Sequence, residues 1–147
     1  MTHEEQPRGI QLALVRAGLA LLAGVELTVG LWNQLLPESF YNDFPTVSLD
    51  PPFSEHYARD FGGATLGIAA VLVIAFIRPR PAFVGIAALA YSLFSVPHFV
   101  FHTLHLEHAT SAEAAFLTVG NGMVALIGLL LGVWSVARVR AEPSRPD

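Results

Sequence analysis

The sequence predicts an all-α, polytopic membrane protein: a bundle of four transmembrane helices with both termini in the cytoplasm. Hydrophobic residues make up 53% of the chain, whereas charged residues make up only 14%. Soluble domains have about 25% charged residues, so this chain has too few polar side chains to cover a surface in water. Four long apolar runs and the placement of the arginines lead to the same conclusion.

The apolar runs define the predicted spans. Each run has about 20 residues or more, the length of a helix that crosses ~30 Å of hydrocarbon. Pro37 ends the first run, and the segment from Arg78 to Pro81 ends the second. Helices are required because lone strands would leave backbone groups unpaired in lipid. The predicted spans are residues 10–36, 57–77, 82–104 and 114–137, with tails at 1–9 and 138–147.

The predicted orientation depends on the arginines, since all eight basic residues of the chain are arginines. Threading four helices up and down puts Arg59 on one side of the bilayer and the other arginines on the opposite side. Cytoplasmic loops carry an excess of basic residues, so both termini are predicted to lie in the cytoplasm. We therefore expect a multi-pass protein of the inner (cytoplasmic) membrane. The arginines of the predicted cytoplasmic side are Arg8, Arg16, Arg78, Arg80, Arg138, Arg140 and Arg145.

The composition also excludes several kinds of site. The chain has no cysteine, which excludes disulfides, thiol chemistry and cysteine-bound metals. The net charge is -4 and the arginines are scattered, so nucleic acid is not a predicted partner. The first span is not predicted to be a signal peptide, because its head is not basic and Arg16 and Glu26 interrupt it.

The predicted outer loop, residues 37–56, joins the first two spans. Its prolines exclude a long helix, yet Phe40, Tyr41, Phe44 and Phe53 make it too aromatic for a free linker. Loops of this length are often lids or binding loops, so one interpretation folds it over the outer mouth of the bundle. The other interpretation is an aromatic belt at the lipid headgroups.

Polar residues inside the spans form the predicted site. Glu26 lies about ten residues from the outer end of its span, ~15 Å deep, where a carboxylate is costly and seldom faces lipid. His98 and His102 lie one turn apart on one face of the third span, directly after Pro97. Either these groups converge in a polar pocket near the outer face, or each is satisfied locally. The candidate ligand-binding residues are Glu26, Asn33, Arg59, Asp60, His98, His102 and Asn121.

Three roles fit such a pocket. Histidines one turn apart, with carboxylates from neighbouring helices, resemble the ligands of metal sites in helical bundles. In this interpretation a divalent metal is bound by His98, His102, Asp60 and Glu26. An apolar cavity with a few polar groups suits an organic ligand such as a quinone that enters from lipid. In the third interpretation the polar groups only lock helix packing, and the chain is a non-catalytic accessory or scaffolding protein. No catalytic residue is predicted.

Pairs of small residues predict close contacts between helices. The segments GATLG, residues 63–67, and GLLLG, residues 128–132, each place two glycines one turn apart. Such pairs let helix backbones approach in a membrane, so they favour a tight bundle.

Two segments resemble a known family. The first span ends in GLWNQLLPESFY, and the second begins with RDFGGATLGIAAVLVIAF, in which Arg59 precedes the glycine pair Gly62 and Gly63. With a short turn, an apolar span and a glycine-rich fourth span, residues 10–137 resemble the small four-helix DoxX-like membrane proteins of bacteria. DoxX is associated with a membrane quinol oxidase. The resemblance therefore implies a redox-associated membrane subunit, with a membrane protein partner or a second copy of the chain beside it in the bilayer.

Overall fold

The computed structural model describes residues 5–49 and 52–141, and this part of the chain is helical without any strand. Four of its helices are long and apolar enough to cross a membrane, which confirms the predicted all-α bundle. Helix α1 begins earlier than predicted, and α6 continues past residue 137. Arg145 and the distal tails lie outside the described residues. The long helices are α1 (Glu5–Leu35), α3 (Glu55–Ile77), α4 (Pro81–Leu104) and α6 (Asn121–Ala141).

Two short elements lead into the last helix. The helix α5 (Ser111–Ala115) begins with a capping box, in which the Thr110 hydroxyl and the Glu113 carboxylate satisfy each other's backbone N–H groups. A π-helical turn, η2 (Phe116–Gly120), then joins α5 to α6. The elements α5, η2 and α6 together form the fourth candidate span, Ser111–Ala141.

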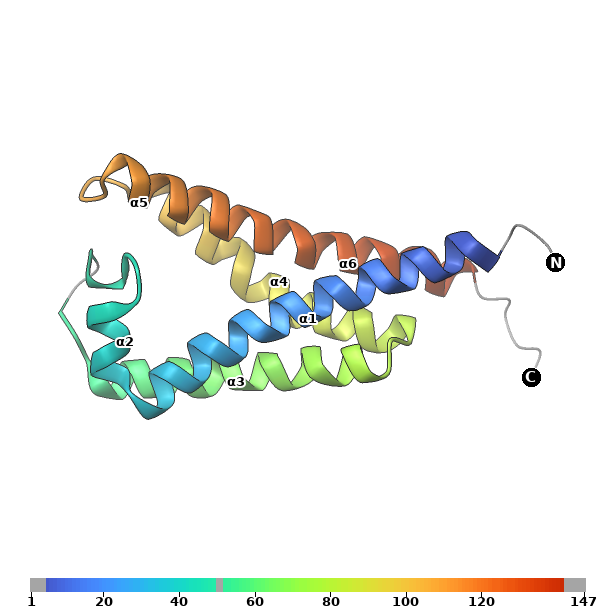
Figure 1. Ribbon diagram of the computed structural model, residues 1–147, viewed down its shortest axis with the longest axis horizontal. Coiled ribbons are helices and arrows are strands. Elements are labelled where there is room, and N and C mark those ends of the chain that lie inside the picture. The colour runs from blue at the N-terminus through green and yellow to red at the C-terminus, as the bar shows by residue number, and fades with distance from the viewer. Residues whose placement is uncertain (1–4, 50–51, 142–147) are drawn as a thin grey trace.

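The bundle consists of two closely packed pairs of helices, α1 with α3 and α4 with α6 (Figure 1). The pairs meet through α3 and α4, and more sparsely through α1 and α6. Gly18 of α1 faces Ile127 and Leu131 of α6, and from there the two pairs diverge toward the end that carries α2 and α5 (Figure 1).

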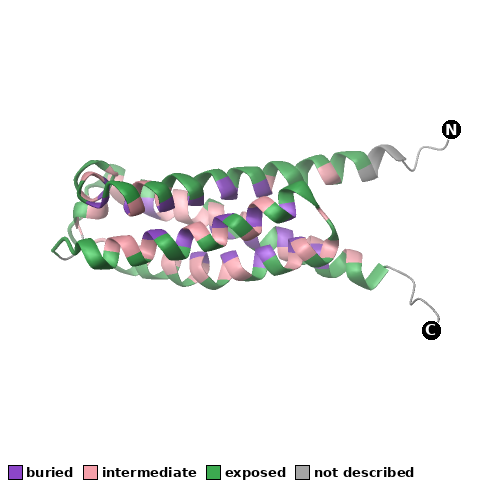
Figure 2. Cartoon of the chain, turned by 90° about the horizontal axis from the view of Figure 1, so that it is seen from below, coloured by how far each residue is buried: buried purple, intermediate pink, exposed green. Residues whose placement is uncertain are grey.

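The outward faces of the helices carry exposed apolar side chains. The buried residues form narrow stripes along the inward faces (Figure 2). On α1 the buried positions include Val15, Leu19 and Leu22, which recur every three or four residues. By contrast, Leu14 and Leu35 of the same helix are 67% and 66% exposed. In the most apolar window of each helix no more than 28% of the residues are buried. A surface this apolar is suited to lipid and indicates a multi-pass membrane protein.

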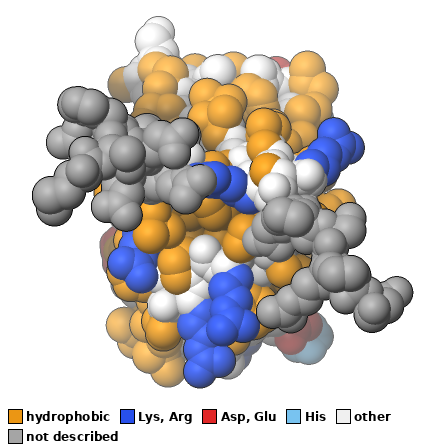
Figure 3. Space-filling view, turned by 90° about the vertical axis from the view of Figure 1, so that its right-hand side faces the viewer, with side chains coloured by type: hydrophobic (Ala, Val, Ile, Leu, Met, Phe, Trp, Pro, Cys, Tyr) orange, Lys and Arg blue, Asp and Glu red, His pale blue; other side chains and the backbone are white. Residues whose placement is uncertain are grey.

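The two ends of the bundle differ in charge. We call one end the arginine end, because the chain turns there at Arg78 and Arg80 and α6 finishes there with Arg138 and Arg140. Blue side chains gather on this face in Figure 3. The other end is the histidine end, and it carries His56, His98, His102, His105 and His108.

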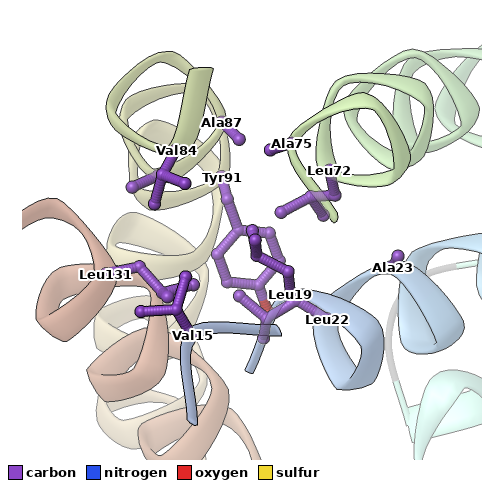
Figure 4. Packing of buried hydrophobic residues seen from close by; sticks show 11 residues of the cluster. Val15, Leu19, Leu22, Ala23, Leu72, Ala75, Val84, Ala87, Tyr91 and Leu131 are labelled. Carbon is purple, nitrogen blue, oxygen red and sulfur yellow. The ribbon is translucent and has the colours of Figure 1, made fainter. Parts of the chain in front are cut away.

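The hydrophobic core lies in the half of the bundle toward the arginine end. Figure 4 shows the Tyr91 ring of α4 pointing between Leu19 and Leu22 of α1, with Leu72 of α3 and Leu131 of α6 beside it. Each of these side chains is at most 5% exposed. The core therefore ties all four helices together at one level of the bundle.

Glycines set the closest contacts, although not all at the predicted positions. A Cβ on Gly62 would lie 2.8 Å from the backbone nitrogen of Gln34, so α1 and α3 touch there almost backbone to backbone. Gly63 and Gly67 of the predicted GATLG pair make no such contact. In the GLLLG pair, Gly128 does, because a Cβ there would lie 2.8 Å from the Tyr91 ring.

The predicted outer loop folds into the helix α2 (Pro37–Asp43) and the 3-10 turn η1 (Val47–Leu49). Trp32 of α1 meets Phe40 edge to face, with ring centroids 5.7 Å apart, and Phe40 stacks on Phe44 at 4.7 Å. The Trp32 indole also donates a hydrogen bond to the Ser39 hydroxyl at 3.1 Å. The loop is thus packed onto the ends of α1 and α3. Whether it acts as a lid stays a prediction.

We expect Gly62→Ala to lower the free energy of unfolding by about 1–3 kcal/mol, because the added methyl would push on the backbone of α1. The matched control is Gly67→Ala on the same helix, where a Cβ has nothing within 4 Å. That variant should be neutral or more stable by up to about 1 kcal/mol. Unfolding in mixed detergent and SDS micelles measures both. Equal effects would show that this contact does not control helix packing.

Candidate functional site

The structure distributes the predicted site residues over several places in the bundle. Glu26 and Asn33 are buried, whereas Asp60 is exposed. The remaining four are half-buried: Arg59, His98, His102 and Asn121. The predicted site residues therefore differ in burial, and each has its own partners.

Glu26 lies within the bundle, in the inward stripe of α1 between Leu22 and Gly30. Its side chain is only 3% exposed, and its Oε2 atom has no hydrogen-bond partner among the described residues. A buried acceptor without a partner costs about 1–3 kcal/mol, and a charged one costs more. The chain therefore carries a destabilising group at the centre of its own bundle.

Two hydroxyl groups of α4 are buried as Glu26 is, and no hydrogen bond joins Ser95 to Glu26 in the described structure. Tyr91 is 1% exposed and interacts electrostatically with the Glu26 carboxylate. Ser95 follows one turn later, is 3% exposed, and its Oγ also lacks a hydrogen-bond partner in the described structure. We call Glu26, Tyr91 and Ser95 the polar centre. It holds one carboxylate and two hydroxyls, and two of its oxygens have unused hydrogen-bonding capacity.

The packing of the surrounding helices explains why the polar centre forms. Gly128 of α6 leaves room for the Tyr91 ring, which reaches from α4 toward α1 (Figure 4). On the α1 side, Gly30 lies next to Thr65 of α3 and brings that helix close. Small residues of α1, α3 and α6 thus let the helices approach one another close to the polar centre.

Tyr91 and Ser95 are not among the site residues predicted from the sequence. Neither residue stands out within the apolar run of α4. Their spacing is informative, however, because Tyr91, Ser95, His98 and His102 follow one another by four, three and four residues. That spacing places them on one helix face, so a search for polar side chains in register with the histidines would have found them.

Asn33 has a structural role. Its amide nitrogen donates to the carbonyl oxygen of Val29 in the same helix at 3.0 Å. Its Cβ lies against Gly62, at the closest approach of α1 and α3. Asn33 is therefore satisfied within its own helix, and it is not part of the polar centre.

Arg59 connects α1 to α3 at the histidine end. Its guanidinium donates to the backbone carbonyl oxygen of Gln34, near the last turn of α1, and to the Glu55 carboxylate, with Nη2 2.8 Å from Oε1. A cation at this position donates a hydrogen bond to a terminal carbonyl group and interacts favourably with the negative end of the helix dipole. Arg59 also lines a groove of about 500 Å³ with Asn42 and Phe53, outside the bundle core.

The histidines of α4 form an aromatic series that leads toward the histidine end. The His98 ring stacks on Phe94, with centroids 5.1 Å apart, and meets the His102 ring at 4.4 Å. Phe94 in turn contacts Phe61 of α3 at 5.8 Å. Asn121 is half-buried at the start of α6, directly after the π-helical turn.

The predicted metal ligands are not brought together. Within residues 5–49 and 52–141, no group of three or more His, Asp or Glu side chains is placed to hold a metal ion. Asp60 is directed away from the others, because it precedes the buried Gly62 by two residues and so lies on the outward side of α3. It faces His56 instead, at 3.3 Å, with both side chains largely exposed.

Comparisons with family models, curated proteins and solved structures found no match for this chain. The polar centre is therefore interpreted from its own geometry.

We expect Glu26→Leu to raise the free energy of unfolding by about 1–3 kcal/mol, because it removes a buried oxygen that has no partner. The matched control is Ser135→Ala. The Ser135 hydroxyl is also buried, but it donates to the Pro81 carbonyl oxygen at 2.7 Å, so its loss should lower stability by about 1 kcal/mol. Unfolding in SDS measures both variants. A less stable Glu26→Leu protein would mean that Glu26 serves helix packing.

Proposed function

We propose that this protein is a multi-pass membrane protein whose polar centre binds a small, lipid-soluble ligand, and that it serves as a redox-associated membrane subunit. One observation carries the proposal: Glu26 Oε2 and Ser95 Oγ are both buried and lack partners among the described residues. Polar groups inside a membrane bundle are costly and generally functional. A ligand that completes their hydrogen bonds would offset that cost.

The chemistry of the polar centre indicates the class of ligand. The Glu26 carboxylate accepts a hydrogen bond, so the ligand should carry an O–H or N–H group. The Ser95 hydroxyl can donate to a ligand oxygen or accept from a ligand hydroxyl. A quinol offers hydroxyl donors and a quinone offers carbonyl acceptors, each on a flat, apolar ring. A benzoquinol therefore suits both groups, and its apolar body suits the surrounding leucines.

The route to the polar centre follows from the arrangement of the helix pairs. The helices α1 and α6 meet at Gly18 and diverge beyond it toward the histidine end (Figure 1). Glu26 lies two turns beyond Gly18, ~12 Å along the axis, on the diverging side. We propose that a lipid-soluble molecule approaches between the pairs, where the side chains that keep Glu26 at 3% exposure would have to move aside.

A second candidate is an accessory or scaffolding protein, in which the polar residues only lock helix packing. The glycine contacts at Gly62 and Gly128 favour it, and so do Asn33 and Thr65, whose side chains are satisfied within their own helices. The two functions differ at Glu26. A packing residue stabilises the bundle, whereas a binding residue costs stability until the ligand is bound.

The orientation belongs to the same proposal. Arginines gather at the arginine end (Figure 3), and the basic ends of membrane helices face the cytoplasm. Both described ends of the chain lie there too, whereas the histidine end carries α2 and α5 (Figure 1). We therefore propose that the arginine end faces the cytoplasm of a bacterial inner membrane.

The ligand proposal predicts that the detergent-purified protein binds a short-chain benzoquinol and that Glu26→Gln weakens this binding by about 10–100-fold. A hydrogen bond to a charged group contributes about 1.5–3 kcal/mol, which gives that range. Ser95→Ala should weaken binding by a smaller factor, and Ser135→Ala should leave it unchanged. Titration calorimetry measures all four proteins. Equal affinity in wild type and Glu26→Gln would exclude the polar centre as the site.

The orientation predicts that a cysteine replacing His108 reacts with a membrane-impermeant maleimide in intact spheroplasts, whereas one replacing Ala141 does not. The chain has no cysteine of its own, so each variant carries a single reactive thiol. Inverted vesicles should give the opposite pattern. Labelling of Ala141→Cys alone in spheroplasts would show that the proposed orientation is reversed.

A further inference from the structure

The inward stripe of α4 carries a series of groups that can pass a proton. Tyr91, Ser95, His98 and His102 lie on one helix face, and successive members are about one turn, or ~5.4 Å, apart along the axis. We call these residues the α4 series. Hydroxyl groups and imidazoles both donate and accept hydrogen bonds, which is what a proton relay requires.

Burial decreases steadily along the α4 series. Tyr91 and Ser95 are 1% and 3% exposed, His98 and His102 are half-buried, and His105 is exposed at the end of the helix. The imidazoles of His98 and His102 are in contact, with ring centroids 4.4 Å apart. The series therefore runs from water at the histidine end to the buried polar centre.

Both ends of this route fit proton transfer. At the inner end, Glu26 Oε2 is an acceptor without a partner in the described structure, and Tyr91 of the series interacts with Glu26. Ser95 Oγ, midway along the route, also has unused hydrogen-bonding capacity. At the outer end, an imidazole takes a proton on one nitrogen and releases one from the other.

Protons have no comparable route from Glu26 toward the arginine end. Beyond Glu26 toward the arginine end, the interior is filled by apolar side chains at most 5% exposed, among them Leu19, Leu22 and Leu72. Two polar groups of α6 are buried on this side in the described structure. The Ser135 hydroxyl donates to the Pro81 carbonyl oxygen, and the Trp134 indole N–H can donate a hydrogen bond but cannot accept one, so it does not relay a proton. A dry apolar core offers a proton no hydrogen-bond partner.

Glu26 is the carboxylate of the proposed route, and the neighbouring helices contribute small or hydroxyl side chains beside it. The buried position of α3 nearest to Gly30 is Thr65, which donates to its own helix, and α6 contributes Gly128 beside Tyr91. Tyr91 of α4 is a titratable side chain close enough to Glu26 to interact with it electrostatically.

We propose that Glu26 exchanges protons with the aqueous phase at the histidine end, through Tyr91, Ser95, His98 and His102, and is isolated from the arginine end. In the forward direction a proton passes from water to His102 and His98, then through the hydroxyls to the Glu26 carboxylate, which becomes a neutral carboxyl group. Release follows the same route in reverse. This activity concerns protons alone and does not require that a ligand binds.

The test measures the carboxyl band of Glu26 by infrared difference spectroscopy on proteoliposomes. The band is assigned by its loss in Glu26→Gln. Vesicle orientation is determined with the single thiol of His108→Cys and an impermeant maleimide, and the interior is strongly buffered. A pH step on the side of the histidine end should change the band, whereas the same step on the side of the arginine end should not. A response of the Glu26 band to both sides, or to neither side, would overturn the proposal.

Variants of the series supply a second measurement. Ser95→Ala and His98→Phe should each slow the response of the Glu26 band by about tenfold or more, the effect of losing one hydrogen bond at the limiting step. The matched control is His56→Phe, which removes an exposed imidazole of α3 that lies outside the series. Circular dichroism and gel filtration confirm the fold of each variant. Unchanged rates in folded Ser95→Ala and His98→Phe would exclude this route. The quinol affinity of the same proteins tests ligand binding separately.

Discussion

The cost of placing a carboxylate in hydrocarbon constrains this structure more than any other interaction. Glu26 lies at the depth where lipid surrounds the helices, and the outward faces of those helices are almost entirely apolar. The carboxylate must therefore face other helices. Glu26 shares one face of α1 with Leu19 and Leu22. The rotation of α1 that buries Glu26 therefore also points these two leucines into the core.

The polar centre and the close helix contacts depend on each other. Gly30 and Gly62 let α1 and α3 approach, and Gly128 admits the Tyr91 ring beside Glu26. Larger residues at these positions would separate the helices and expose the carboxylate to lipid. Glycine in a membrane helix therefore does more here than allow packing. It keeps a polar group away from hydrocarbon, and it makes a buried carboxylate compatible with a folded bundle.

The sequence predicted the architecture well, because helix number and burial follow from length, hydropathy and the cost of buried charge. It predicted the site less well, because a pocket depends on side-chain direction. Asp60 and Gly62 are two residues apart, so one faces outward and the other inward. Arg59 donates to the Gln34 carbonyl oxygen near the end of α1 and lines a groove outside the bundle core. Tyr91 and Ser95 were missed because residue type alone does not distinguish them, whereas their register with His98 does.

The division into two helix pairs has a mechanical consequence. At the arginine end the pairs are joined by the short turn between α3 and α4, and toward the histidine end they diverge. Helix α4 has 24 residues and so is ~36 Å long. A rotation of one pair about the short turn by about 5° would move its far end by ~3 Å, comparable to a hydrogen-bond length. A small rotation at the turn between α3 and α4 would thus produce a larger displacement between the two helix pairs at the histidine end.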